Sequence, residues 1–167
     1  MIAFVILHYR AADMTRKCVE RIKALEGDKK IVIVDNASPN GTGQELLDEY
    51  TEDSEIKVIL NPENSGFAKG NNMGVRWVQE NVPADFVVVL NNDVEILQKD
   101  FCPKVEAIYR RYSFDVLGPD IISVFSGIHQ NPKSLHGYSL ESVRKKREKV
   151  ARTKNPILLL LSSGEKN

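Results

Sequence analysis

The sequence predicts an α/β protein with a mostly parallel sheet and helices on both faces of that sheet. Three apolar runs rich in Val and Ile support this fold class: Ile2–His8, Lys30–Asp35 and Phe86–Leu90. Continuous apolar runs of this length are typical of strands buried on both faces, as in parallel sheets. Segments with helical spacing of apolar residues lie between them. Such alternation predicts βαβ units with right-handed crossovers.

Composition sets the broad class. The chain has 167 residues, of which 42% are hydrophobic and 28% charged, so we expect a soluble globular protein with a real core. The formal net charge is zero, and we expect no nucleic-acid partner. Cys18 and Cys102 lack metal-ligand spacing and fit small core residues in a reducing compartment. No apolar run is long enough for a membrane span, and Ile2–Leu7 is too short for a signal peptide, so we expect a cytoplasmic protein.

The first strand, Ile2–His8, is followed by Tyr9-Arg10-Ala11-Ala12, a turn without glycine. Asp13 is expected to cap a helix that runs through Leu25, since apolar residues recur there at helical spacing. Gly27 stands where a helix commonly ends in a left-handed residue.

The second strand, Lys30–Asp35, ends in a carboxylate. After the turn, Thr42 and Glu45 have the spacing of a capping box and predict a helix to about Thr51. Ile56–Leu60 is a shorter and more amphipathic strand.

Pro62 breaks the chain before a predicted helix, Phe67–Gln79. Gly66, Gly70 and Gly74 are four residues apart. Gly70 and Gly74 fit close packing of the helix on the sheet. At Gly66 we expect the backbone to approach a ligand at the helix N-terminus. Lys69 then faces a phosphate, the alternative being a solvated surface lysine.

Polar residues follow the strand Phe86–Leu90 directly: Asn91, Asn92, Asp93 and Glu95. In open α/β sheets, ligands bind at the carboxyl ends of the strands. Hard oxygen donors suit Mg²⁺ or Mn²⁺ bridging a diphosphate. The alternative is an ordinary turn, in which Asn and Asp are common.

The rest of the chain changes character. A helix over Phe101–Tyr112 and a strand or extended segment over Asp115–Gly118 are expected. We place a domain boundary here, with a first domain over residues 1–125 and a second segment over 126–167.

The segment 126–167 begins with a polar loop that holds His129 and His136 and continues with a helix over Leu140–Lys154. Seven Lys or Arg residues lie between Arg144 and Lys154, so this helix is expected either at an anionic inner membrane surface or simply in solvent. The short apolar run Ile157–Leu161 suggests self-association into a homo-oligomer.

Several nucleotide and hydrolase motifs are absent. A dinucleotide fold needs a Gly-rich turn after the first strand, and a phosphate loop needs Gly-Lys-Ser/Thr. Phospho-receiver domains carry acids where Tyr9 and Arg10 stand, and no Gly-x-Ser-x-Gly elbow occurs.

Three segments resemble the signatures of the inverting GT-A glycosyltransferases. They are Val34–Ser38, Asn64–Gly74 and Leu90–Asp93, and their order and spacing agree over roughly residues 1–125. The chain is most similar to the rhamnosyl- and hexosyltransferase branch that builds bacterial surface polysaccharides. The resemblance implies a Rossmann-like nucleotide-diphospho-sugar transferase fold.

The resemblance also implies roles. Tyr9 and Asp35 hold the nucleobase, and Asp93, at the Asp-x-Asp motif, coordinates Mg²⁺ or Mn²⁺ on the diphosphate. A carboxylate at Asp35 suits uracil or thymine, and guanine also offers donors, so the expected partner is a UDP-, dTDP- or GDP-linked sugar. The full set of expected nucleotide-binding residues is Tyr9, Asp35, Asn64, Gly66, Lys69, Asn72 and Asn92.

The resemblance ends before the acceptor half of the family, which carries an acidic general base. Beyond Asp120 the carboxylates are Glu141, Glu148 and Glu165, none paired with Asp, so the catalytic residue stays unknown. Two functions remain open: metal-dependent transfer of a sugar to a saccharide or lipid-linked acceptor, or a truncated, non-catalytic nucleotide-sugar-binding module. A nucleotidyltransferase is a distant third, because no Gly-rich basic loop follows the first strand.

Overall fold

A computed structural model describes residues 1–130, 141 and 145. It divides the chain into two compact units, Met1–Ser113 and a second that begins at Phe114. The predicted boundary after residue 125 stays a prediction. The predicted basic helix, apart from two of its residues, and the apolar run over 157–161 lie outside the described residues.

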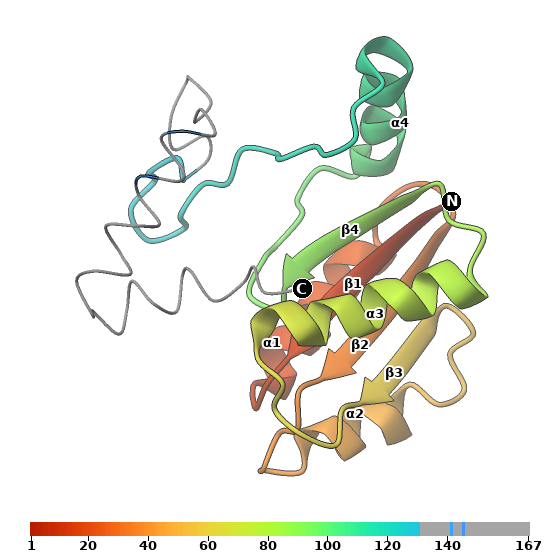
Figure 1. The fold of residues 1–167 in the computed structure, drawn as a ribbon, viewed down its shortest axis with the longest axis vertical. Helices are drawn as coiled ribbons and strands as arrows, with labels where there is room; N and C mark the ends of the chain where they lie inside the picture. The colour runs from red at the N-terminus through yellow and green to blue at the C-terminus, as the bar shows by residue number, and fades with distance from the viewer. Residues whose placement is uncertain (131–140, 142–144, 146–167) are drawn as a thin grey trace. The chain divides into compact units, whose positions relative to one another are not determined.

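The first unit is built on a four-stranded parallel sheet with the order β3-β2-β1-β4. All four strands therefore end at the same edge, which carries the arrowheads in Figure 1. β1 is central, and its seven residues are almost all buried, as the continuous apolar run predicts. The strands are β1 (Ile2–His8), β2 (Lys29–Asp35), β3 (Ile56–Leu60) and β4 (Phe86–Asn91).

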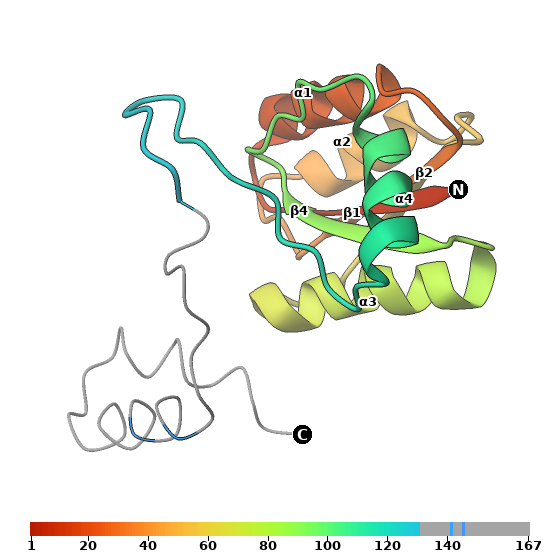
Figure 2. The ribbon, with the colours of Figure 1, turned by 90° about the horizontal axis from the view of Figure 1, so that it is seen from above.

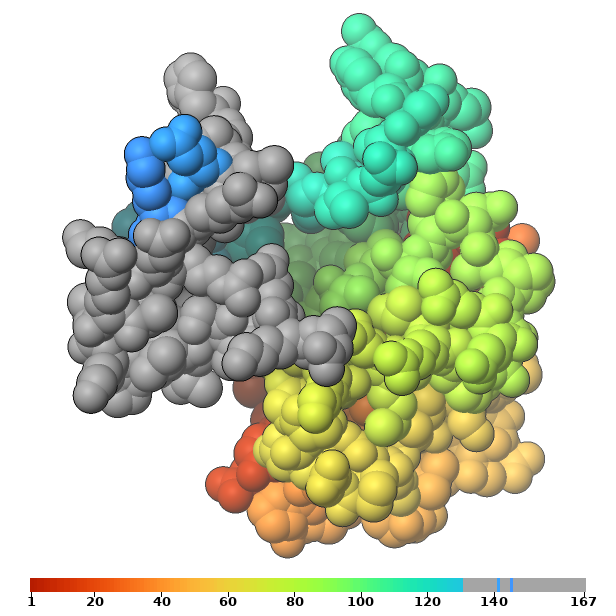
Figure 3. All heavy atoms as spheres, viewed as in Figure 1, coloured from red at the N-terminus to blue at the C-terminus, as the bar shows by residue number. Residues whose placement is uncertain are grey.

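Helices cover both faces of the sheet, which confirms the predicted fold class. α1 and α2 lie on one face and α3 lies on the other, as Figure 2 shows from above. α3 forms a continuous band of atoms over its face in Figure 3. The helices are α1 (Ala12–Lys23), α2 (Thr42–Glu49), α3 (Phe67–Asn81) and α4 (Phe101–Tyr112).

The glycine stripe of α3 brings this helix close to the sheet. A Cβ atom at Gly74 would lie 2.4 Å from Val5 Cγ1, and one at Gly70 would lie 2.6 Å from Leu7 Cδ1. A larger residue at Gly74 would press on the short, branched Val5 and Val34 side chains, and one at Gly70 would require the end of the Leu7 side chain to move. The prediction of close packing at these two glycines is therefore confirmed.

α4 packs on β1 and β4 through aromatic side chains. The rings of Phe4 and Phe101 have centroids 6.2 Å apart, and Phe86 meets Tyr109 edge-on at 5.1 Å. Cys102 is buried, as expected of a small core residue.

Two predicted helix caps are wrong. Ala11, not Asp13, occupies the N-cap of α1, and Asp13 lies in its first turn. Gly41, with φ of 79°, is the N-cap of α2, so Thr42 is already inside the helix. The Thr42 hydroxyl is held by other partners, described below, and makes no capping bond.

Of the two alternatives expected for Asp115–Gly118, a strand or an extended segment, the strand does not form. In the described part of the second unit, the strand-like pairing is an antiparallel bridge between Ile122 and His129. His129 Nδ1 lies 2.6 Å from a carboxylate oxygen of Asp120, so this histidine has a local partner.

Candidate nucleotide-sugar site

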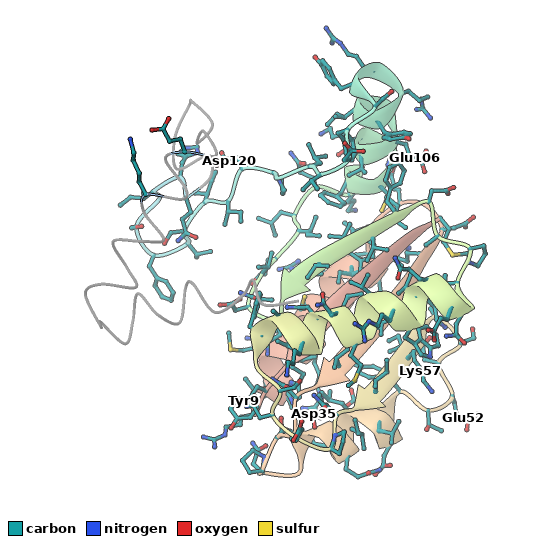
Figure 4. All side chains as sticks on the ribbon, in the orientation of Figure 1. Tyr9, Asp35, Glu52, Lys57, Glu106 and Asp120 are labelled. Carbon is teal, nitrogen blue, oxygen red and sulfur yellow. The ribbon has the colours of Figure 1, made fainter. Side chains whose placement is uncertain are left out.

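The candidate site lies at the edge where the parallel strands end. Register places His8 of β1 beside Asp35 of β2, and Leu7 beside Asn91 of β4. Figure 4 shows Tyr9 and Asp35 close together at this edge. The predicted polar residues after β1, β2 and β4 therefore lie at the same edge of the sheet.

The Asp35 carboxylate is buried, with its side chain 7% exposed. It accepts hydrogen bonds from the Ser38 hydroxyl and from the Ser38 backbone N–H, the latter at 3.2 and 3.3 Å. Burying a carboxylate costs free energy unless it is hydrogen-bonded, and Ser38 meets that need. Ala37 between them has φ of 58°, a left-handed conformation that costs a non-glycine residue about 1 kcal/mol.

α2 begins directly against this carboxylate. A Cβ atom at Gly43 would lie 2.2 Å from Asp35 Oδ2, so only glycine fits there. The sequence analysis did not identify Gly43 or Ser38 as site residues. Ser38 falls within the signature Val34–Ser38, and that position was the available signal.

The turn after β1 is tied to the turn after β2. The Arg10 N–H donates to Ser38 Oγ at 2.8 Å, and the Asn40 amide donates to the Arg10 carbonyl at 2.9 Å. Arg10 has φ of 65°, and its guanidinium stacks over the Tyr9 ring at 4.8 Å. The Tyr9 side chain is 39% exposed, so its ring offers a flat surface at the site.

A cluster of amides continues from Asp35 to the start of α3. The Asn36 side chain donates to Asn64 Oδ1 at 2.9 Å and accepts from Asn61 at 3.1 Å. It also accepts from the Ser65 N–H at 3.2 Å. Asn36 and Asn61 are buried. Sequence reasoning identified Asn64 but missed the two buried partners, which are 25 residues apart in the chain.

Gly66 opens α3 in a conformation that suits glycine, with φ of 82°. Its N–H donates to Asn64 Oδ1 at 3.1 Å, and a Cβ atom there would meet nothing within 4 Å. The space above Gly66 is therefore open at the positive end of the α3 dipole. Lys69 and Asn72 on the first turns of α3 are exposed.

Asn71, next to Asn72, is a further candidate for a ligand-binding residue. It is buried, and its amide donates to the Phe67 carbonyl at 3.0 Å. Its Oδ1 is the one buried side-chain polar atom in the described part of the chain without a hydrogen-bond partner. Asn72, which is exposed, was among the predicted nucleotide-binding residues, and Asn71 was not.

The turn after β4 is more open. Asn91 and Asp93 are exposed, and in the described part of the chain the Asp93 carboxylate has no hydrogen bond or ion pair. Glu95 is engaged by Arg21 of α1 at 3.0 Å. The Asn92 amide donates to Thr15 Oγ1 at 3.1 Å, which holds this turn against α1.

These residues fit a divalent cation only in part. No group of three or more His, Cys, Asp or Glu side chains among the described residues can hold a metal ion. Mg²⁺ is commonly held by one or two carboxylates together with substrate phosphates and water. The free Asp93 carboxylate fits that arrangement, so the donor set suits a cation that arrives with a diphosphate.

Two buried side chains near the site stay uncharged. Burial, with the nearby Asp93 and Glu95 carboxylates, raises the pKa of the Cys18 thiol to about 12. Burial lowers the pKa of His8 below its ordinary value of 6.5. His8 is fully buried.

Comparison with known proteins places this chain in a family. The family model for glycosyl transferase family 2 matches residues 3–162. A hexosyltransferase of low-salt glycan biosynthesis from Haloferax volcanii, Agl10, is 26% identical over 122 residues, which cover 73% of this chain. The chain spans 37% of the length of that relative.

Solved structures show the same fold. Residues 1–349 of TarS from S. aureus superpose with a TM-score of 0.55 and 17% identity, covering 67% of this chain and 33% of that one. The mannosyltransferase PcManGT from Pyrobaculum calidifontis, solved with GDP-Man and Mn²⁺, gives a TM-score of 0.50 and 20% identity over 59% of this chain and 29% of its own. With three signature segments gathered at one sheet edge and a family match over nearly its whole length, the chain belongs to glycosyl transferase family 2 and has a GT-A fold.

Proposed function

We propose that this chain binds a nucleotide diphosphate sugar together with Mg²⁺ or Mn²⁺ and serves as the donor-binding part of a hexosyl transfer to a saccharide or lipid-linked acceptor. The observation that carries this proposal is the set of hydrogen bonds that joins two of the signature segments, Val34–Ser38 and Asn64–Gly74, at the carboxyl edge of the sheet, the edge at which β4 and the third segment also end. Ser38 donates to Asp35, and the next residue, Asn36, donates to Asn64 just before α3.

The nucleobase side is supported by geometry suited to a planar ring. The exposed Tyr9 ring lies beside two tied turns, and buried carboxylate and amide groups stand behind them. The Asp35 carboxylate and the Asn64 amide are the proposed polar contacts. An acceptor such as a carboxylate suits the ring N–H of uracil, thymine or guanine.

The diphosphate side is supported by the start of α3 and by Asp93. Open space over Gly66 lets phosphate oxygens reach backbone N–H groups at the helix N-terminus. Lys69 and Asn72 are exposed on the first turns, and Asn92 lies beside Asp93. Asp93 would hold the cation, which would supply positive charge to a leaving nucleoside diphosphate.

The comparisons point the same way. A structure of TarS was solved with UDP, and that of PcManGT with GDP-Man and Mn²⁺. Agl10 is named a hexosyltransferase. These statements hold for those proteins, and they support a nucleotide sugar as the ligand here.

A non-catalytic binding module is the second candidate. The chain spans about a third of the length of its relatives. The described carboxylates past residue 119 both have partners, since Asp120 meets His129 and Glu141 meets Lys145 at 2.6 Å. These pairings favour ordinary surface roles over that of a general base. Membrane contact through the basic helix and self-association through residues 157–161 are further proposals, and apart from Glu141 and Lys145 these residues lie outside the described part of the chain.

Titration calorimetry tests the proposal. UDP, dTDP and GDP are titrated with and without Mn²⁺ into the wild type, Asp93→Ala and the matched control Glu80→Gln on the far end of α3. We expect Mn²⁺ to strengthen binding in the wild type and in the control, and this gain to disappear in Asp93→Ala. Absence of binding to every nucleotide in the wild type would sink the proposal.

A turnover assay separates the two candidates. Nucleotide sugars that bind are incubated with saccharide and lipid-linked acceptors, and release of the nucleoside diphosphate is followed. Release that depends on acceptor identifies an enzyme. Binding without acceptor-dependent release identifies the module.

A further inference from the structure

His8 is a buried titratable residue to which the proposed function assigns no role. It ends β1, the strand that lies between β2 and β4, and its side chain is fully buried. Both ring nitrogens have partners: Nδ1 lies 2.7 Å from Thr15 Oγ1 of α1, and Nε2 lies 2.9 Å from Thr42 Oγ1 of α2. The imidazole therefore bridges the two helices under the site edge.

The direction of the hydrogen bonds can be worked out from the Thr42 end. The Asn40 amide N–H₂ must face the Arg10 carbonyl, at 2.9 Å, since a carbonyl only accepts. Asn40 therefore turns its Oδ1 toward Thr42, and the single Thr42 hydroxyl proton is donated to it at 2.8 Å. Thr42 Oγ1 is left as an acceptor for His8, so the His8 proton must be on Nε2.

The same logic fixes the Thr15 end. With its proton on Nε2, neutral His8 presents Nδ1 as an acceptor, and the Thr15 hydroxyl donates to it. That contact, at 2.7 Å, is shorter than the alternative bond from Thr15 to the Ala11 carbonyl at 3.2 Å. The Thr15 oxygen then accepts from the Asn92 amide at 3.1 Å. Every donor in the series has an acceptor.

We propose that neutral His8, with its proton on Nε2, is a positioning residue that holds the Asn92 turn of the metal motif and the Asn40–Thr42 turn of the nucleobase side in one fixed arrangement. The proposal rests on the proposed function for its ligands. It adds that one buried residue supports both halves of the site, through two branches that meet at His8: Asn92 and Thr15 on one side, Thr42 and Asn40 on the other.

The charges around His8 agree with a neutral ring. Burial disfavours the imidazolium most, and Arg16 of α1 disfavours it further. Asp35, whose Oδ1 lies 3.9 Å from Nε2, and Glu45 of α2 act in the opposite direction. The net effect is a lowered pKa, which keeps the Nδ1 acceptor available to Thr15 at neutral pH.

Nuclear magnetic resonance tests the hydrogen-bond series without any ligand. A long-range proton–nitrogen spectrum reports which imidazole nitrogen of His8 carries the proton, with the signal assigned through His8→Gln. We expect Nε2–H with unprotonated Nδ1, and a changed Asn92 side-chain amide signal in Thr15→Val. A ring protonated on Nδ1, or an Asn92 signal untouched by Thr15→Val, overturns the proposal.

Nucleotide titration tests the two branches separately. The readout is the Mn²⁺ gain, defined as the ratio of nucleotide Kd without Mn²⁺ to nucleotide Kd with it. Thr15→Val removes the Asn92 branch and should reduce this gain on the order of tenfold, the scale seen when groups behind a metal ligand are removed. Thr42→Val should weaken nucleotide binding and leave the gain unchanged. Thr15→Ser keeps the hydroxyl and should restore the wild-type gain.

His8 variants divide the two branches. His8→Asn can accept from Thr15 but does not reach Thr42, so it should keep the Mn²⁺ gain. His8→Gln can donate to Thr42, so it should keep the nucleotide affinity and lose the gain. Variants that lower only the melting temperature, with the gain constant throughout, show a merely structural role and overturn the proposal.

The two proposals fail in different ways. If the wild type binds no nucleotide, the proposed function fails, and the resonance experiment still decides the His8 series. If the wild type shows a Mn²⁺ gain that Thr15→Val leaves intact, the positioning role fails and the proposed function stands.

Discussion

The two sides of the candidate site are built differently, although they share one sheet edge. On the nucleobase side, Asp35, Asn36 and Asn61 are buried and hydrogen-bonded. On the metal-motif side, Asn91 and Asp93 are exposed, and the turn is held by one ion pair and by the Asn92 amide. The first side is complete without ligand, whereas the second leaves its carboxylate in water.

Physical chemistry accounts for the difference. A buried polar group needs fixed partners, and the resulting network sets the position of a flat ligand in advance. A cation site that depends on phosphate oxygens cannot be completed before the ligand arrives. A hydrated carboxylate exchanges water for the cation at little cost. The arrangement predicts ordered binding, with the nucleotide recognised on the rigid side and the cation captured with the diphosphate.

A substitution that disturbs the buried nucleobase side should have the largest effect on the unfolding free energy. Gly43→Ala would press a methyl group onto the Asp35 carboxylate, and overpacking of this kind costs about 2 to 3 kcal/mol of unfolding free energy. Urea denaturation measures the loss. Gln44→Ala, at the exposed neighbouring position of α2, is the matched control and should stay near wild type. Equal stability of the two variants would contradict the close contact.

Removing the buried carboxylate should come next. Asp35→Ala leaves the Ser38 donors without their acceptor, which costs about 1 to 2 kcal/mol. The same change at Asp93 should leave the unfolding free energy within about 0.5 kcal/mol, since exposed positions contribute little. Thermal and urea unfolding of both alanine variants test the contrast. A larger loss at Asp93 than at Asp35 would reverse the comparison.

Lowering the pH should destabilise the folded protein through protonation of His8. The pKa of His8 is lower in the folded protein than its ordinary value of 6.5, so the unfolded chain takes up this proton first as pH falls. The contribution of neutral His8 to the unfolding free energy should therefore be fully present above pH 6.5. Below that pH it should decline, by at most about 1.4 kcal/mol per pH unit, the limit for one proton. The decline should be smaller in His8→Gln. Identical pH profiles for the wild type and His8→Gln would show that His8 does not cause the decline in stability.

The smallest effect is expected from the ion pair on the open side. Glu95→Gln removes the exposed contact with Arg21, and such pairs contribute about 0.2 to 1 kcal/mol. The wild-type advantage should shrink as salt is raised, because mobile ions screen exposed charges. Melting temperatures at low and high salt measure it. A salt-independent difference would point to packing.

The strands could be predicted because long apolar runs constrain them strongly. The second strand was expected from Lys30 and begins at Lys29, and the fourth was expected to end at Leu90 and ends at Asn91. Helix caps could not, because their side chains have competing partners. Thr42 has the capping pattern, yet its hydroxyl lies between His8 and Asn40.

The candidate site was predictable in outline only. The three signatures indicate which segments matter, and the structure gathers them at one edge. Local sequence does not show that Asn36 meets Asn61 or that Gly43 lies against Asp35, because those contacts depend on how the helices sit on the sheet. The left-handed turns at Arg10 and Ala37 were equally hidden, since neither residue type favours that conformation.

The central place of β1 bears on how this protein is made. One of the two neighbours of β1, β4, lies some 84 residues later along the chain, as the contact between the Met1 amino group and Asp85 illustrates. Parallel pairing across such a separation requires a long loop to close. The entropy cost of closure comes before the favourable contacts form, which makes folding slow. Until β4 is synthesised, one edge of an almost wholly apolar strand stays open to other chains. Expression at lower temperature or with chaperones should therefore raise the yield of native protein more than any change at the surface.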